Sequence, residues 1–321
     1  MQSVLEMITK QLLIHNGRQL GTLLGLVLVI SVFAFLSPYF LTLSNLVNIT
    51  QQTSINAIMA VGMTFVIITA GIDLSVGSIM AFSGIILADS IQNGIAEPIA
   101  IIIGLSVGTI CGLSNGILIS YGKLPPFIAT LGMMSVARGA ALLYSQGRPI
   151  SGFTEEFRFL ATGQIIGIPT SVWIMISLYV IAYILLNKTV LGRYTYAIGG
   201  NETAANLSGI NTKLFKTIVY GISGLLSASA AVILTARLNS AQPIAGIMYE
   251  LDAIAAVVIG GTSLLGGEGK ISGTLIGALI MGVLRNGLNL MGVSSFIQQI
   301  VIGLVIILAV LIDMSLKKRR N

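Results

Sequence analysis

The sequence predicts an all-α polytopic membrane protein with about ten transmembrane helices, several of them short or interrupted by glycine. Of its 321 residues, 55% are hydrophobic and 9% are charged. An ordinary soluble domain has about 25% charged residues, so this chain has too little polar surface to cover a water-soluble body. Long apolar runs also recur along the whole chain. We therefore expect residues 1–321 to form a single transmembrane domain in a lipid bilayer.

Each apolar run is long enough for a membrane-spanning helix or is broken by glycine. The first run follows a polar start and lacks a small-residue cleavage site, so we interpret it as a retained span rather than a signal peptide. The expected spans are 22–36, 46–70, 76–91, 97–119, 125–144, 169–187, 214–236, 250–265, 271–290 and 296–312.

The basic residues predict how these spans are oriented. Ten spans place both termini on one side of the membrane, and 12 of the 17 Lys and Arg residues fall on that side. Three, Arg148, Arg158 and Arg237, fall on the other side, and Arg138 and Arg285 lie within spans. Because short cytoplasmic segments are enriched in Lys and Arg, we expect both termini to be cytoplasmic.

Two connecting segments are long. Residues 145–168 are expected outside the cell, where their polar side chains suit a surface that meets a polar partner. A plain solvated loop is the alternative for this segment. Residues 188–213 form a cytoplasmic segment in which Gly199 and Gly200 are expected to break the chain before a short helix.

This short helix is expected over 201–208, with Asn201 as its N-cap and Gly209 as its stop. Glu202, Asn206 and Ser208 are candidates for its polar face. Two helical turns are marginal in water by themselves, so we expect the helix to dock on another protein. The alternative is a loop that merely joins two spans.

A stripe of small residues in the fourth span predicts close helix packing. Glycine recurs there at every fourth position, which removes the side chains from one stripe of the helix. The four positions are Gly104, Gly108, Gly112 and Gly116. The single cysteine, Cys111, has no partner for a disulfide and is interpreted as a packing residue.

Three polar and glycine-rich stretches, 51–78, 249–277 and 285–299, interrupt the apolar pattern and indicate a transport pathway. The stretches over 51–78 and 249–277 each carry a polar opening, an apolar segment and a glycine-rich link, which suggests duplicated halves. Amide and hydroxyl groups bind sugar hydroxyls without a fixed charge. The candidate pathway residues are Gln51, Gln52, Thr53, Asn56, Asn115, Asn286 and Asn289. For Arg138 and Arg285, a functional role and structural pairing both stay open.

Several functions are disfavoured by what the sequence lacks. Its basic residues are not interleaved with aromatics as a nucleic-acid surface requires. It has no Walker A or dinucleotide-binding pattern, and no His, Cys or Asp grouping for a metal site or a membrane enzyme. Acidic residues and histidine form no deep series for a proton relay. We therefore expect no metal and no cofactor bound by this chain, and no catalytic residue.

Long stretches of the sequence resemble a known family, the permease subunits of bacterial ABC importers for monosaccharides. The resemblance covers nearly the whole chain after about residue 35. It is carried by QQTSINAIMAVGMTFVIITAGIDLSVGS, LGRYTYAIGGNETAANLSGI, LNSAQPIAGIMYELDAIAAVVIGGTSLLGGEGKISGTLIGALI and RNGLNLMGVSSF. It implies a multi-pass, non-catalytic subunit of the bacterial inner membrane that translocates a monosaccharide, with ribose as the expected sugar.

The resemblance also implies partners. These are a second copy of the chain, a cytoplasmic ATPase subunit that binds ATP and Mg²⁺, and an external sugar-binding protein. The segment 188–213 would contain the helix that couples to the ATPase. Its coupling residues would be Asn201, Glu202, Ala205, Asn206, Ser208 and Gly209. A self-sufficient secondary transporter or channel is the alternative, which the missing ion-coupling groups disfavour.

Overall fold

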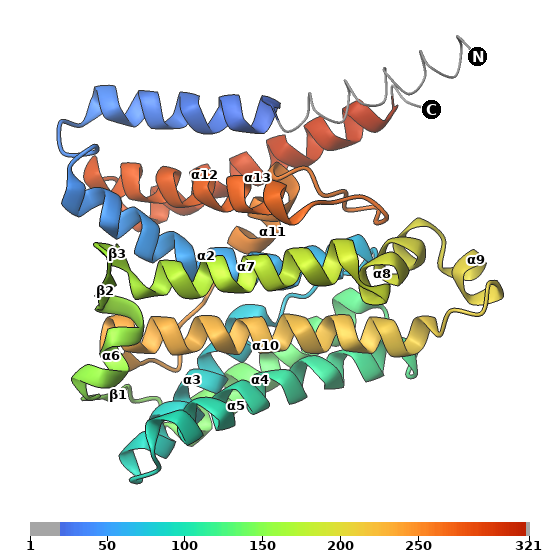
Figure 1. Ribbon diagram of the computed structural model, residues 1–321, viewed down its shortest axis with the longest axis horizontal. Helices are drawn as coiled ribbons and strands as arrows, with labels where there is room; N and C mark the ends of the chain where they lie inside the picture. The colour runs from blue at the N-terminus through green and yellow to red at the C-terminus, as the bar shows by residue number, and fades with distance from the viewer. Residues whose placement is uncertain (1–19, 319–321) are drawn as a thin grey trace.

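The computed structural model describes residues 20–318 and shows a bundle of helices that lie side by side along one axis (Figure 1). The basic residues Lys10, Arg18, Arg319 and Arg320, and with them both chain ends, lie outside the described residues. The helices of the bundle are Leu20–Leu36, α2 (Leu43–Ile68), α3 (Val76–Gln92), α4 (Glu97–Ser120), α5 (Pro126–Tyr144), α7 (Thr170–Lys188), α10 (Thr212–Leu238), α11 (Tyr249–Ile259), α12 (Ile271–Leu290) and α13 (Ser295–Lys318).

Short elements gather at the two ends of this bundle (Figure 1). At the α6 end, α6 (Glu155–Thr162) lies near two antiparallel strand pairs; at the opposite, α9 end lie α8 (Val190–Gly200) and α9 (Glu202–Leu207). β1 (Ile150–Ser151) pairs with β4 (Ser240–Ala241), so that Ile150 faces Ala241. β2 (Gln164–Ile165) pairs with β3 (Ile168–Pro169) in a hairpin that places Ile165 opposite Ile168.

The segment 145–168 is more ordered than the loop that the sequence predicts. Thr154 caps α6, because its hydroxyl accepts a hydrogen bond of 3.2 Å from the Phe157 backbone N–H. The β2–β3 turn has positive φ at both central residues, 55° at Ile166 and 74° at Gly167. Such a turn matches the right-handed twist of a two-residue hairpin. Elements this short carry too little periodicity to be predicted.

Each expected span corresponds to a helix, but the helices differ in length. Six of the described helices, α2, α4, α5, α7, α10 and α12, are long and apolar enough to cross a membrane. The largest shortfall against the expected spans is α11, which has 11 residues rather than the predicted run over 250–265. Its length of about 16 Å is half of a bilayer core. The helix stops at Gly260, and Gly261 follows with a φ of 92°. The count of ten spans stays a prediction.

The centre of the bundle is formed by α2 and α10. In their most apolar stretches, 89% of the α2 residues and 78% of the α10 residues are buried, against 22% in α5. These two helices contact each other, and α10 also packs against α3 and α4. The apolar side chains of α5 therefore face outward, as expected of a helix that contacts lipid.

The glycine stripe of α4 lies against neighbouring helices. All four glycines are buried. A methyl group on Gly108, Gly112 or Gly116 would meet the backbone of α10, at Gly224, Tyr220 or Thr217, whereas Gly104 faces α3. The missing side chains thus allow α4 and α10 to approach backbone to backbone.

This contact predicts that Gly112→Ala destabilises the protein. The new methyl group would overlap the Tyr220 carbonyl and the Gly224 backbone, and overpacking of this kind costs about 1–3 kcal/mol. Thermal unfolding of the purified protein in detergent measures the effect. Gly139→Ala in α5 is the matched control, since nothing lies within 4 Å of its added carbon. Equal melting temperatures for the two variants would contradict the backbone contact.

Candidate functional site

The short helix α9 is capped at one end, stopped by glycine at the other, and held to the bundle by one buried side chain and one salt bridge. Asn201 caps it, with its side-chain oxygen accepting a hydrogen bond of 2.9 Å from the Ala204 N–H. Gly209 ends it with a φ of 86°. Ala205 is buried, and Glu202 forms a salt bridge of 3.0 Å with Lys216 of α10. Most of the predicted coupling residues therefore shape or anchor α9.

The three residues of the predicted polar face of α9, Glu202, Asn206 and Ser208, are all exposed, but two of them already have partners within the protein. The Ser208 hydroxyl donates to the Ala204 carbonyl within the helix at 2.9 Å, and Glu202 is occupied by Lys216. Asn206 is exposed, and next to it Leu207 is 85% exposed. Sequence reasoning missed Leu207, although an apolar side chain on a two-turn helix is a signal for docking.

The chain before α9 is helical, which was not expected, and the expected break falls directly after Gly199 and Gly200 instead of at them. Both glycines belong to α8, which ends at Gly200. Tyr196 of α8 donates a hydrogen bond of 2.7 Å to the carbonyl of Gly269, in the link between α11 and α12. Burial raises the pKa of Tyr196 to about 12, so its hydroxyl stays protonated and able to donate at physiological pH.

Asn115, one of the predicted pathway residues, belongs to a buried network around Asp73. The Asp73 carboxylate is fully buried and accepts hydrogen bonds from the hydroxyls of Ser75, at 2.5 Å, and Ser223, at 2.8 Å. Asn115 donates to the Ser75 hydroxyl at 2.8 Å. The network joins the start of α3 to α4 and α10, and it occupies Asn115 inside the bundle.

A second polar group lies between α2, α11 and α12. Asp252 of α11 is buried and pairs with Arg285 of α12 at 2.5 Å. Asn56 of α2 donates to the same carboxylate at 3.4 Å. One Asp252 oxygen, the Asn56 side-chain oxygen and the Thr53 hydroxyl are buried without a hydrogen-bond partner. Arg285 therefore has a structural partner, and a functional role for it is not tested by this pairing.

The other predicted pathway residues lie in separate places. Gln51 donates to the Ala161 carbonyl of α6 at 3.3 Å, and Gln52 is half-buried on α2. Asn286 exchanges two hydrogen bonds, of 3.0 and 2.9 Å, with Asn45. Asn289 accepts from Gln298 of α13 at 2.7 Å. The structure thus brings Asn56 to the Asp252 carboxylate but does not gather the predicted residues into one lining.

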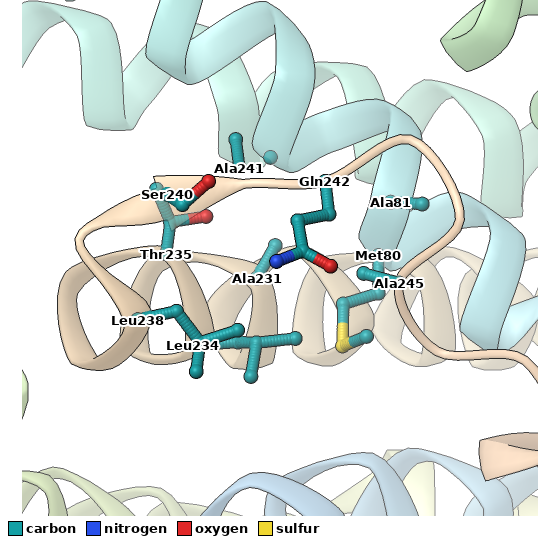
Figure 2. A pocket seen from close by; sticks show the side chains of 11 residues that line it. Met80, Ala81, Ala231, Leu234, Thr235, Leu238, Ser240, Ala241, Gln242 and Ala245 are labelled. Carbon is teal, nitrogen blue, oxygen red and sulfur yellow. The ribbon is translucent and has the colours of Figure 1, made fainter. Parts of the chain in front are cut away.

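The pocket at the α6 end contains none of these residues (Figure 2). It lies between α3, α10 and β4, where Gln242 extends over Ala231 and Leu234 beside Met80. Its volume of about 10 Å³ admits about one water molecule and is far too small for a monosaccharide. Arg138 lies close by, donating to the carbonyls of Pro243 and Ala245 at 2.6 and 2.7 Å.

The acidic and metal-ligating side chains of the described residues are scattered. Among the side chains that the structure describes, those of residues 20–311, no three His, Cys, Asp or Glu come together as a metal site would require. The charged groups inside the bundle instead bind one another, hydroxyls or backbone carbonyls.

A family model described as "Branched-chain amino acid transport system / permease component" matches residues 45–310. The chain belongs to this permease family. It is accordingly a multi-pass protein of the bacterial inner membrane. No solved structure matches the chain.

Several curated relatives cover nearly the whole chain. The ribose import permease protein RbsC of Escherichia coli is 52% identical over 296 residues, which span 91% of this chain and 92% of that protein. RbsC of Bacillus subtilis is 51% identical over 310 residues, with 95% and 96% covered. The D-allose transport system permease protein AlsC of Escherichia coli is 40% identical over 300 residues, with 93% and 92% covered.

The Asp252–Arg285 ion pair predicts how the stabilities of single and double variants compare. Arg285→Met leaves Asp252 without its cation and should lower the free energy of unfolding by about 2–3 kcal/mol, less than for a fully buried pair because Arg285 is 25% exposed. Thermal unfolding in detergent measures this. The double variant Arg285→Met, Asp252→Leu should recover part of the loss, since no unpaired charge remains. Simple addition of the two single losses would show that the pair contributes no coupling.

Proposed function

We propose that this chain is the transmembrane subunit of an ATP-driven importer that moves ribose across the bacterial inner membrane. One observation carries the proposal: over 91% of the chain, 52% of the residues are identical to a protein named ribose import permease. ATP and Mg²⁺ are bound by a separate ATPase subunit, and this chain acts as a non-catalytic conduit.

In this proposal the α9 end faces the cytoplasm and the α6 end faces outward. The positive charges support this orientation, because Lys188, Arg193, Lys213, Lys216 and Lys270 lie in or beside the elements of the α9 end. The chain then crosses the membrane about ten times, with α11 as a half-length element, and both termini are cytoplasmic. The external segment 145–168 meets the sugar-binding protein.

The ATPase subunit docks on α9. A two-turn helix transmits force only if it is anchored, and α9 is anchored by buried Ala205 and by the Glu202–Lys216 bridge. Asn206 and Leu207 supply its free surface. ATP binding in the partner then shifts the permease between inward-facing and outward-facing states, because the docked complex stabilises those states differently.

Ribose is a neutral sugar and needs hydrogen-bonding groups rather than a fixed charge. Gln51, Gln52, Thr53 and Asn56 form a polar run on α2 that reaches the Asp252 group, which supports a pathway beside α2. Two copies of the chain enclose the pathway in this proposal. Asn115 and Asn286 are buried in contacts between helices, and they support the pathway walls from behind.

Docking through Leu207 predicts that Leu207→Arg abolishes ribose uptake by cells that carry the partner subunits. The arginine would place a charge where an apolar side chain meets the partner, which removes co-purification of the ATPase without disturbing the bundle. Leu207→Met keeps an apolar side chain and should retain uptake. Normal uptake and normal co-purification by Leu207→Arg would contradict docking at α9.

Reconstitution in vesicles tests the function as a whole. Ribose accumulation should require the chain, the ATPase subunit, the sugar-binding protein and ATP together. Robust ribose flux by the isolated chain without ATP would instead identify a self-sufficient transporter or channel.

A further inference from the structure

Three segments that are distant in sequence meet backbone to backbone at the α9 end. They are the C-terminal end of α2, the C-terminal end of α8, and the link 260–270 between α11 and α12. The Gly267 N–H donates a hydrogen bond of 2.9 Å to the carbonyl of Ile68, the last residue of α2. A carbon added to Gly199 of α8 would overlap both that carbonyl and the Gly267 nitrogen. Gly199 therefore sits directly on the hydrogen bond that joins α2 to the link.

The link itself has a shape that requires glycine at this contact. Gly266 and Gly267 have φ values of 82° and 73°, which L side chains rarely adopt. A carbon on Gly266 would meet the Gly199 carbonyl and Ala70, and one on Gly267 would meet Gly200. Both sides of the contact are thus backbone. An added methyl group would therefore meet atoms that cannot move aside as a flexible side chain can.

Tyr196 fixes α8 to the link at a second point. Its hydroxyl donates a hydrogen bond of 2.7 Å to the Gly269 carbonyl. Tyr196 itself lies about one helical turn before Gly199 in α8. Two separate contacts on one rigid helix prevent α8 from rotating on the link. We call the set formed by Gly199, Ile68, Gly267, Tyr196 and Gly269 the Gly199 junction.

We propose that the Gly199 junction is the point at which a displacement of α9 reaches α2 and α12. This inference rests on the proposed function and assigns positioning roles to Gly199 and Tyr196. Asn201 follows α8 directly and caps α9, so α8 and α9 are joined by one residue. The far side of the junction leads into α2, which lies at the centre of the bundle, and through residue 270 into α12.

The alternative route from α9 runs through α10. It is less suited to a separate movement, because α10 is buried along most of its apolar length and packs on α2, α3 and α4 at once. A helix fixed in this way moves only with the whole bundle. α8 lies beside the bundle and touches it through the junction and its neighbours α7 and α10, so it can shift as a unit.

Adjacent glycines offer a matched test. Gly199→Ala places a methyl group into the junction, whereas Gly200→Ala points into open space with nothing within 4 Å. Both changes raise helix propensity equally, so local helix stability does not distinguish them. Each variant is reconstituted in liposomes with the ATPase subunit and the sugar-binding protein, and ribose uptake and ATP hydrolysis are measured together.

We expect Gly199→Ala to retain ATPase binding and ATP hydrolysis while ribose uptake per ATP falls roughly tenfold, equal to about 1.4 kcal/mol of coupling. Gly200→Ala should stay close to the wild type. Tyr196→Phe, which keeps the packing and removes only the hydrogen bond to Gly269, should give a smaller loss of the same kind. Equal uptake per ATP in the Gly199 and Gly200 variants would overturn the proposal.

Hydrogen exchange at the Gly267 amide separates this proposal from the function on which it rests. ATPase binding should change the exchange of this amide in the wild type and in Gly200→Ala, but not in Gly199→Ala. If the wild-type complex binds ATPase but takes up no ribose, the proposed substrate fails and the exchange result still decides the junction. If the wild type binds no ATPase, the proposed function and the role of the junction are both overturned. If it binds ATPase but the exchange of the Gly267 amide does not change, only the role of the junction is overturned.

Discussion

Close contact between helix backbones is the constraint on which this structure depends. In a bilayer, helices gain little from burying apolar side chains against one another, so packing and hydrogen bonds must hold them together. The glycine stripe of α4 meets α10 in this way, and Gly273 and Gly277 of α12 meet Gly260 and Ala256 of α11. The same geometry recurs at the Gly199 junction. Glycine is therefore distributed through this chain as a packing residue as much as a turn residue.

Buried polar groups also join the central helices to one another. The fully buried Asp73 carboxylate takes hydroxyl donors from α10 and from the start of α3, and Asn115 extends the network to α4. The Asp252–Arg285 pair ties α11 to α12. These groups fix the central helices to each other, and α8 and α9 lie outside that fixed centre. A part that moves when a partner binds is expected at such a margin.

The sequence allowed the positions of the helices to be predicted, because long apolar runs are a strong signal. The cap at Asn201 and the stop at Gly209 were also predictable, since both depend on local residue chemistry. α8 was missed because two glycines in a row resemble a break, whereas a close contact with Ile68 and Gly267 accounts for Gly199. The candidate pathway residues could be recognised as polar groups at membrane depth, but the sequence could not show which of them are held in contacts between helices. Asn286 finds its partner in Asn45, 241 residues away, and no local pattern reports such a pairing.

The proposed docking role requires α9 to lie on the cytoplasmic side of the membrane, so the side that α9 occupies tests this role most directly. A cysteine introduced at Leu207, in a Cys111→Ser background without other thiols, can be labelled with a membrane-impermeant maleimide. A cytoplasmic α9 should be labelled in inside-out vesicles and protected in intact spheroplasts. Labelling of intact spheroplasts from outside would contradict it.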